Sequence, residues 1–261
     1  KNYSDLKPLS PGMFGYSILR ATAHQGFMKD LMDMLSACDV PLEGLHTETG
    51  PGVYEAAIVN TTPLEAADRA TIFKTAAKEI AGQHNLMATF MSRISEELPG
   101  CSGHIHLSLS DLQGNPLFYH DQDPSHMSDL FKSFLAGQIH CLPHILPMMA
   151  PNVNSFKRLV KGFWAPTSAT WGLDNRTCAL RVLNSSASSC RVEVRVPGAD
   201  MNPYLAINAA LASGLYGIKN KLQLKQPPVK GNGYEDKDAV SFPSDLQQAA
   251  HEFKSSPLCR E

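Results

Sequence analysis

Hydrophobic and polar residues alternate strictly from Cys190 to Pro197, and this pattern predicts a β-strand with one apolar face. Three valines fall on one side of the strand, whereas Arg191, Glu193 and Arg195 fall on the other. An acid between two arginines is suited to holding anions and a cation together. A salt-bridged outer face of a sheet is the alternative interpretation, and this strand alone does not decide between them.

Two other segments predict strands that carry polar groups on one face. In S-G-H-I-H-L-S, the residues His104, His106 and Ser108 alternate with apolar side chains. Two histidines at this spacing on a strand can bind a metal ion or a phosphate, or simply face the solvent. The segment T-C-A-L-R-V predicts a strand that places Arg181 on one face.

A hairpin is predicted around the turn Gly50-Pro51-Gly52, after a strand over residues 42–48. Glu48 and Glu55 stand at either end of this turn, so pairing of the strands would let both carboxylates reach the same face. A cation between them would relieve their repulsion. Two solvated glutamates are the alternative.

Apolar residues at helical spacing predict five helices, over residues 24–37, 62–84, 127–142, 202–222 and 244–253. The second begins with a T-P-L-E capping box that has Pro63 at the first helical position. Prolines 143, 147 and 151 are expected to end the third. A short strand is predicted over 86–91, and a loop on the rim of a cleft over 154–166.

Composition narrows the function classes. The 261 residues are 43% hydrophobic and 18% charged, enough for one large globular domain or two small ones. A net charge of −2 argues against nucleic-acid or membrane-surface partners, and no apolar run reaches the ~18 residues of a membrane span. Six cysteines without a C-x-x-C pair, and no signal peptide, favour reduced thiols in the cytoplasm. Because the chain begins with Lys1, we expect a fragment of a longer protein.

Five motifs together resemble the catalytic domain of class I glutamine synthetases. In order between about residues 45 and 205, they are E-T-G-P-G-V-Y-E, S-G-H-I-H-L-S, N-S-F-K-R-L-V-K-G-F-W-A-P, D-N-R-T-C-A-L-R-V and R-V-E-V-R-V-P-G-A-D-M-N-P-Y-L. The resemblance implies one α+β domain over 1–261, with a curved antiparallel sheet forming a half-barrel and helices on its convex face. It also implies a homo-oligomer of stacked rings, a dodecamer.

In the family, ATP phosphorylates glutamate and ammonia displaces the phosphate, with Mg²⁺ or Mn²⁺ as cofactor. The resemblance implies two pairs of metal ligands, Glu48 with Glu55 and His104 with Glu193. It assigns five residues to the nucleotide and its phosphates: His106, Ser108, Arg176, Arg181 and Arg191. Arg158 and Arg195 match the pair that holds the glutamate carboxylate. Guanidinium groups suit these planar anions.

Several positions depart from the family's pattern. Trp164 stands where the family has its catalytic glutamate, a general base, so no catalytic residue is assigned. Val53 replaces a glutamine of the metal hairpin, and Pro99 replaces an asparagine of the glutamate-binding loop. An upstream E-x-E strand, the amino-terminal domain and the carboxyl end are expected to be missing from this fragment.

These departures predict a pseudoenzyme. Phe163-Trp164 is also similar to the lengsin branch of the family, which is non-catalytic and occurs in the vertebrate eye lens. That similarity implies a structural or chaperone-like role with lens intermediate-filament proteins as partners. The alternative hypothesis is an active ATP-dependent glutamate–ammonia or glutamate–amine ligase, in which Trp164 belongs to a remodelled acceptor pocket. A nucleotide-binding regulatory module is a third.

Overall fold

The computed structural model describes residues 5–260, and the chain forms two compact units. Of the described residues, unit 1 comprises 5–90 and 97–99, and unit 2 comprises 91–96 and 100–260. Residues 1–4 and 261 of the expected 1–261 domain lie outside the described residues. Within the described range, no helix is long and apolar enough to cross a membrane.

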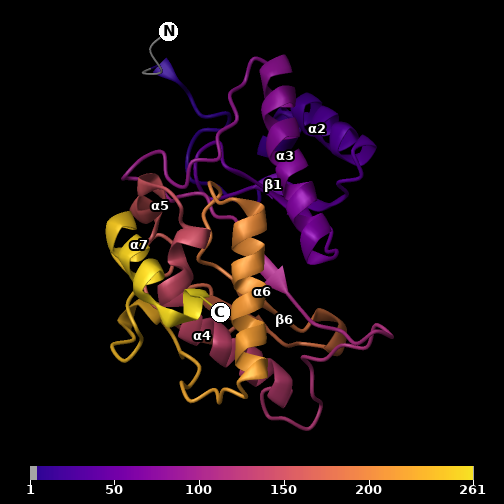
Figure 1. Cartoon of the computed structure of the whole chain (residues 1–261). Helices are drawn as coiled ribbons and strands as arrows, with labels where there is room; N and C mark the ends of the chain where they lie inside the picture. Colours follow the sequence, from indigo (N-terminus) through magenta and orange to yellow (C-terminus); the bar gives the residue numbers. More distant parts are fainter. Residues whose placement is uncertain (1–4, 261) are drawn as a thin grey trace. The chain divides into compact units, whose positions relative to one another are not determined.

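Among its described residues, unit 1 contains three α-helices and a hairpin. The helices are α1 (Ile18–Ala23), α2 (Gln25–Ala37) and α3 (Pro63–Gln83), and the antiparallel strands are β1 (Leu42–Thr47) and β2 (Tyr54–Ile58). Helices α2 and α3 lie side by side (Figure 1). They bury Leu31 and Leu35 against Ala76, Ala77 and Ile80, which supplies the core of the unit. The two predicted helices and the hairpin are confirmed.

The start of α3 differs from the prediction. Pro63 is at the beginning of the helix as expected, because its missing N–H is not needed there. However, the Thr62 side chain makes no capping hydrogen bond, and the hydroxyl of Thr61 donates to the Glu65 carboxylate instead. The predicted capping box is therefore not formed.

Unit 2 is built on a four-stranded sheet in the order β3-β6-β5-β4. The strands are β3 (Ile105–Leu107), β4 (Trp171–Leu173), β5 (Leu180–Leu183) and β6 (Arg191–Val194). The β6 strand is antiparallel to both β3 and β5, whereas β4 joins β5 in parallel. The sheet is open and does not close into a barrel. The α+β prediction is confirmed, and the parallel edge strand β4 is an addition to it.

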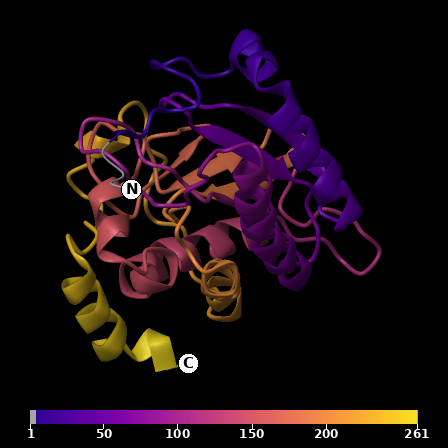
Figure 2. The ribbon, with the colours of Figure 1, turned by 90° about the horizontal axis from the view of Figure 1, so that it is seen from above.

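Two long helices cover one side of this sheet, α4 (Asp129–Met149) and α6 (Pro203–Lys219) (Figure 2). Val192 and Val194 of β6 are fully buried, as their alternation predicts. The helices approach closely because a side chain at Gly137 would collide with the backbone of α6 at Ser213 and Gly217.

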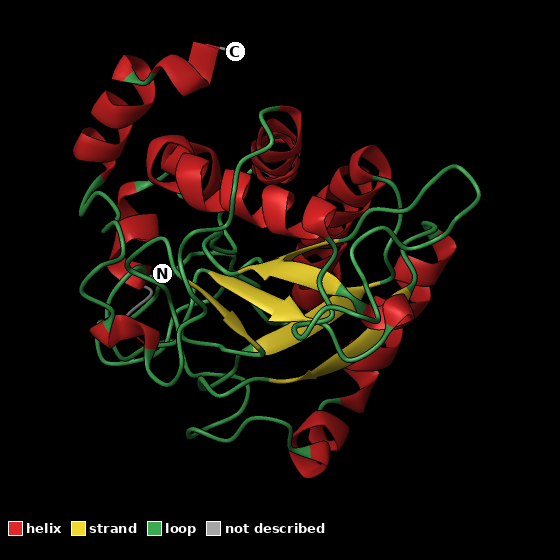
Figure 3. Cartoon of the chain, turned by 90° about the horizontal axis from the view of Figure 1, so that it is seen from below, coloured by secondary structure: helices red, strands yellow, loops and turns green. Residues whose placement is uncertain are grey.

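The remaining elements of unit 2 are short and joined by long loops (Figure 3). They are α5 (Val153–Arg158), α7 (Leu246–Ser255) and the 3-10 helices η2 (Ala187–Ser189), η3 (Gly233–Glu235) and η4 (Pro257–Arg260).

Three local predictions are wrong. Helix α4 continues through Pro143 and Pro147 to Met149, because Leu142, Leu146 and Met149 are almost fully buried and this packing outweighs the lost amide hydrogen bonds. The predicted 154–166 loop begins with α5, whose start is capped reciprocally by Asn152 and Ser155. Residues 86–91 form no strand.

Candidate active site

The centre of the site is Glu193 on β6. Its cross-strand partners are His106 of β3 on one side and Arg181 of β5 on the other. The side chain of Glu193 is only 3% exposed, so its charge needs close partners. The strand therefore places a buried carboxylate in the middle of the polar face that the sequence predicts.

Three side chains hold the Glu193 carboxylate. His104 Nδ1 lies 2.9 Å from Oε1, Arg195 Nη1 donates to the same oxygen at 2.6 Å, and Arg181 Nη1 donates to Oε2 at 2.8 Å. Burial alone would raise the pKa of Glu193. The hydrogen bond from His104 and the charges of the two arginines outweigh it and hold that pKa well below its usual range, so the group is ionised at neutral pH.

His104 is neutral at physiological pH. Burial, together with repulsion from Arg195, lowers its pKa to about 4, although the contact with Glu193 acts in the opposite direction. Its Nε2 atom is buried and has no hydrogen-bond partner among residues 5–260. A neutral imidazole with an unused ring nitrogen is the state in which histidine binds metals.

The donor types at this centre fit a divalent cation. Because His104 Nδ1 donates to Glu193 Oε1 at 2.9 Å, the unprotonated Nε2 is the ring nitrogen that can bind a metal ion. His104 and Glu193 are therefore the residues of unit 2 that would hold Mg²⁺ or Mn²⁺.

Arg195 and Arg158 differ in what their guanidinium groups contact. Arg195 Nε is buried without a hydrogen-bond partner in the described part of the chain, so one donor is available to a ligand. Arg158 is 3% exposed and donates to the backbone oxygens of Val196 at 2.8 Å and Arg195 at 3.0 Å. Burial and the neighbouring Arg195 lower the pKa of Arg158 to about 10, which leaves it protonated at pH 7. Arg158 thus braces the strand end that carries Arg195.

The expected nucleotide residues are only partly brought together. Arg191 Nε donates to His106 Nδ1 at 3.0 Å, which fixes the proton of a neutral His106 on Nε2. Ser108 lies beyond the end of β3 and is exposed. Arg176 is also exposed and makes no ion pair with any described residue. Arg181, in contrast, is bonded to both Glu193 and Asp174.

Unit 1 carries a second group of candidate ligands. His46, Glu48 and Glu55 offer one ligand atom each, and these atoms all lie within 4.8 Å of one another. His46 Nδ1 is 3.8 Å from Glu48 Oε1, and His46 Nε2 is 3.9 Å from Glu55 Oε2. Glu48 and Glu55 do reach the same place, as the hairpin predicts. Two carboxylates and an imidazole are a donor set that fits Mn²⁺ or Mg²⁺.

His46 was missed by the sequence analysis. The signal was present, because His46 and Glu48 alternate along one strand and therefore share a face. Pairing of β1 with β2 then places His46 opposite Glu55.

A family model for the glutamine synthetase catalytic domain matches residues 7–261 of the chain. The chain belongs to the glutamine synthetase family. A "Type-1 glutamine synthetase 2" of Dictyostelium discoideum is 52% identical over 100% of this chain and 50% of its own length. A "Glutamate--isopropylamine ligase" of a Pseudomonas species is 40% identical over 99% of the chain and 56% of its own length.

A solved structure titled "GmaS/ADP complex" superposes with a TM-score of 0.86 at 27% identity, over 96% of this chain and 59% of that one. The chain thus spans about half the length of the curated relatives it matches.

The prediction of a non-catalytic lens protein is wrong. The glutamine synthetase relatives are named as synthetases and ligases, so the comparisons favour an enzyme, and the chaperone role and lens-filament partners lose their support. The physical error lay in the weight given to the departures at Trp164, Val53 and Pro99. Loss of a general base costs about 10²–10⁴-fold, whereas enzymes accelerate reactions by roughly 10⁶-fold or more. Departures from the family's pattern at these positions do not by themselves exclude catalysis.

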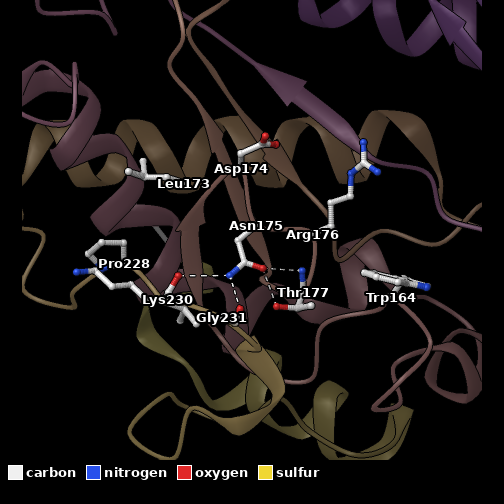
Figure 4. Close-up of a pocket in the computed structure, with 10 residues that line it drawn as sticks. Trp164, Leu173, Asp174, Asn175, Arg176, Thr177, Pro228, Lys230 and Gly231 are labelled. Carbon is white, nitrogen blue, oxygen red and sulfur yellow. Dashed lines mark hydrogen bonds between the residues drawn. The ribbon is translucent and has the colours of Figure 1, made fainter.

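Trp164 lies on the wall of an open cavity of about 450 Å³ (Figure 4). Its backbone is in the left-handed region with φ of 59°, and its side chain is 57% exposed. Its backbone oxygen is 3.4 Å from Arg195 Nη2, which joins this family loop to the Glu193 centre.

Proposed function

We propose that the protein is an ATP-dependent ligase that joins the γ-carboxyl group of glutamate to ammonia or a primary amine. The observation that carries the proposal is the buried Glu193 centre, which keeps an ionised acid, a neutral histidine and an unused arginine donor within one cluster. The names of the relatives support it, because they include a glutamine synthetase and an amine ligase.

In this proposal each cluster has one task. The Arg195 Nε–H binds the carboxylate of glutamate, while Arg158 holds Arg195 in place. His106, Ser108, Arg176, Arg181 and Arg191 serve the nucleotide and its phosphates. Mg²⁺ or Mn²⁺, when bound by the carboxylate and histidine groups of the two units, neutralises phosphate charge. The overall reaction consumes glutamate, ATP and a protonated amine, and releases the amide, ADP, inorganic phosphate and one proton.

The proposal also covers assembly and location. The full-length protein would form a homo-oligomer of stacked rings, a dodecamer, in the cytoplasm, because members of this family assemble in that way. Sedimentation of the full-length protein at micromolar concentration would test this, and a monomer would contradict it.

The activity test uses the full-length protein with ATP, glutamate and excess Mn²⁺ or Mg²⁺. ADP formation should require both glutamate and either ammonium or a primary amine, and mass spectrometry should detect the γ-glutamyl amide. The Glu48→Gln variant is the control for metal dependence and should be strongly impaired. Absence of glutamate-dependent ADP formation with ammonium and with every amine tested would overturn the ligase proposal.

A further inference from the structure

The guanidinium group of Arg93 joins two segments of unit 2 that are far apart in the chain. Arg93 is only 7% exposed, and its Nε and Nη2 atoms donate to the backbone oxygens of Ser95 at 2.9 Å and Glu96 at 2.6 Å. Its Nη1 atom donates to the backbone oxygen of Lys157 in α5 at 2.7 Å. The main chain of Arg93 also exchanges two hydrogen bonds with the side chain of Asn154, at 3.0 and 2.8 Å. These bonds hold the guanidinium group in one orientation.

The ring of Phe163 lies over this fixed guanidinium group. The Arg93 Cζ atom is 4.3 Å from the ring centroid, well within the range of a cation–π contact. Phe163 belongs to the loop over residues 159–166 that follows α5 and also carries Trp164. The two neighbours of Phe163, Gly162 and Trp164, are exposed and have left-handed backbones with φ of 86° and 59°. The half-buried ring of Phe163 therefore anchors this part of the loop to the body of unit 2.

The anchor lies next to a contact with the Glu193 centre. The backbone oxygen of Trp164 accepts from Arg195 Nη2 at 3.4 Å, which is longer than the about 2.7–3.2 Å of a typical N–H···O bond. A small displacement of the loop would therefore break this hydrogen bond. Arg195 Nη1 donates to Glu193, and its Nε atom is the buried, unpartnered donor that we assign to the glutamate carboxylate. The position of the loop thus bears on the orientation of that donor.

We propose that Arg93 and Phe163 are positioning residues for the substrate carboxylate. This inference rests on the proposed ligase function. Phe163, held on Arg93, keeps the Trp164 backbone oxygen against Arg195, and Arg195 then presents its Nε–H in the orientation that binds glutamate. Arg93 and Phe163 do not contact the substrate themselves. Because they act through Arg195, their removal should change the binding of glutamate and leave the binding of ATP unchanged.

Phe163→Leu tests the contact, because it removes the ring and keeps an apolar side chain. We expect the KM for glutamate to rise about 2–5-fold, which corresponds to the loss of an exposed cation–π contact, while kcat and the KM for ATP change by less than about twofold. Phe163→Tyr keeps the ring and should keep the native KM. Phe90→Leu is the matched control, because Phe90 is a half-buried ring of unit 1 that contacts the amino groups of Lys74 and Lys78. It should leave all three constants unchanged.

The position of the loop can be measured without turnover. Lys161 in the loop and Lys225 outside it are both exposed lysines of unit 2, and trypsin cleaves after exposed lysines. In the full-length protein, cleavage after Lys161, followed by mass spectrometry, should become severalfold faster in Phe163→Leu, whereas cleavage after Lys225 should keep its native rate. Equal acceleration at both sites would show that the substitution weakens the whole unit and would overturn the proposed anchor.

A double-mutant cycle tests whether Arg93 acts through Phe163. Arg93→Lys keeps the charge but loses the planar fork that donates to three backbone oxygens. The rise in the KM for glutamate in the double variant should be smaller than the product of the two single effects, because both changes remove one contact. A rise equal to that product would overturn the link between the two residues. If Arg93→Lys does not fold, Phe163→Leu alone decides.

The same kinetic data separate this inference from the ligase proposal. A native KM for glutamate in Phe163→Leu, with turnover intact, would overturn the inference and leave the ligase proposal standing, even if cleavage after Lys161 is faster. Absence of glutamate-dependent turnover in the native protein would overturn both, because there would then be no substrate carboxylate for Arg195 to bind.

Discussion

The two ligand clusters of the chain are built in opposite ways. In unit 2, Glu193 is buried and already bonded to a histidine and two arginines. In unit 1, His46, Glu48 and Glu55 are partly exposed, and their closest mutual approaches are near 4 Å. The first cluster is held together by its own opposite charges, whereas the second brings two acids towards the same histidine.

Because of this difference, the two clusters should contribute differently to folding stability and to ligand binding. A buried acid that loses its cations, or buried cations that lose their acid, leave an uncompensated charge inside the protein. Partly exposed acids are solvated when no cation is present, so their removal changes affinity more than stability. We therefore expect substitutions in unit 2 to affect folding strongly and substitutions in the hairpin cluster to affect metal binding.

The largest effect is expected for Glu193→Gln. Removing the charge leaves the buried Arg195 and the partly buried Arg181 beside a neutral amide, and breaking such a buried pair costs about 3–5 kcal/mol. Urea unfolding should show this loss together with the loss of activity. The control is Asp174→Asn, which removes another partner of Arg181 that is 75% exposed, and it should cost less than about 1 kcal/mol. Equal losses in the two variants would contradict the distinction between buried and exposed partners.

A smaller loss is expected for Gly100→Ala. The added methyl group would collide with the backbone oxygen of Ser92 and lie 2.8 Å from Arg158 Cγ, so it displaces the residue that braces Arg195. Overpacking of this kind costs about 1–3 kcal/mol, measurable by thermal unfolding. Gly82→Ala in α3 is the matched control, because nothing lies within 4 Å of its new methyl group. A Gly100→Ala protein as stable as this control would show that the loop at Ser92 yields without strain.

Glu48→Gln tests the hairpin cluster by itself. We expect the affinity for Mn²⁺ to fall at least tenfold, about 1.4 kcal/mol, since the site loses one of its two negative charges. Calorimetry would measure the affinity, and the melting temperature in EDTA should change little. Glu43→Gln removes an exposed acid from the same strand outside the cluster and should leave the affinity unchanged. Unaltered Mn²⁺ binding in Glu48→Gln would remove Glu48 from the site.

The last prediction is a dependence of stability on pH in the presence of EDTA. The pKa of His104 is lowered from 6.5 to about 4, so its contribution is complete above pH 6.5 and is lost as the pH falls towards 4. The low pKa of Glu193 acts in the same direction at still lower pH. The free energy of unfolding should change with pH by at most about 1.4 kcal/mol per pH unit. His104→Gln should reduce this pH dependence of the free energy of unfolding, whereas His120→Gln at an exposed position should not.

Regular periodicity predicted much of what the structure contains. Alternation along 190–197 predicted both the strand and the polar face of Glu193. Helical spacing predicted α2, α3 and α6 within a few residues, and it predicted the start of α4 but not its end. The shortest elements were not predictable in this way. Strand β4 has only three residues, and α5 has only six. The side chains that cap α5, those of Ser155 and Asn152, donate hydrogen bonds to Asp200, which lies 45 and 48 residues further along the chain. Such elements depend on tertiary contacts that local patterns do not contain.

The candidate site also depends on tertiary contacts that the sequence pattern does not contain. The sequence predicted Glu193, His104 and five arginines as site residues, but the environment of each depends on the fold. Arg158 was expected to hold a substrate carboxylate, whereas its terminal nitrogens donate to backbone oxygens. The departures at Trp164, Val53 and Pro99 were taken as the mark of a lost enzyme because they were weighed without the rest of the cluster.

The close crossing of α4 and α6 has a consequence for the order of folding. The amide of Gln138 on α4 donates to the backbone of Ala210 on α6, 72 residues away, and strands β4, β5 and β6 lie between the two helices in the chain. Closing so long a loop is entropically costly unless the intervening strands have already shortened it. The two helices should therefore dock late in folding. Gln138 and Gly137 should then have low φ-values, so that substitutions there mainly speed unfolding.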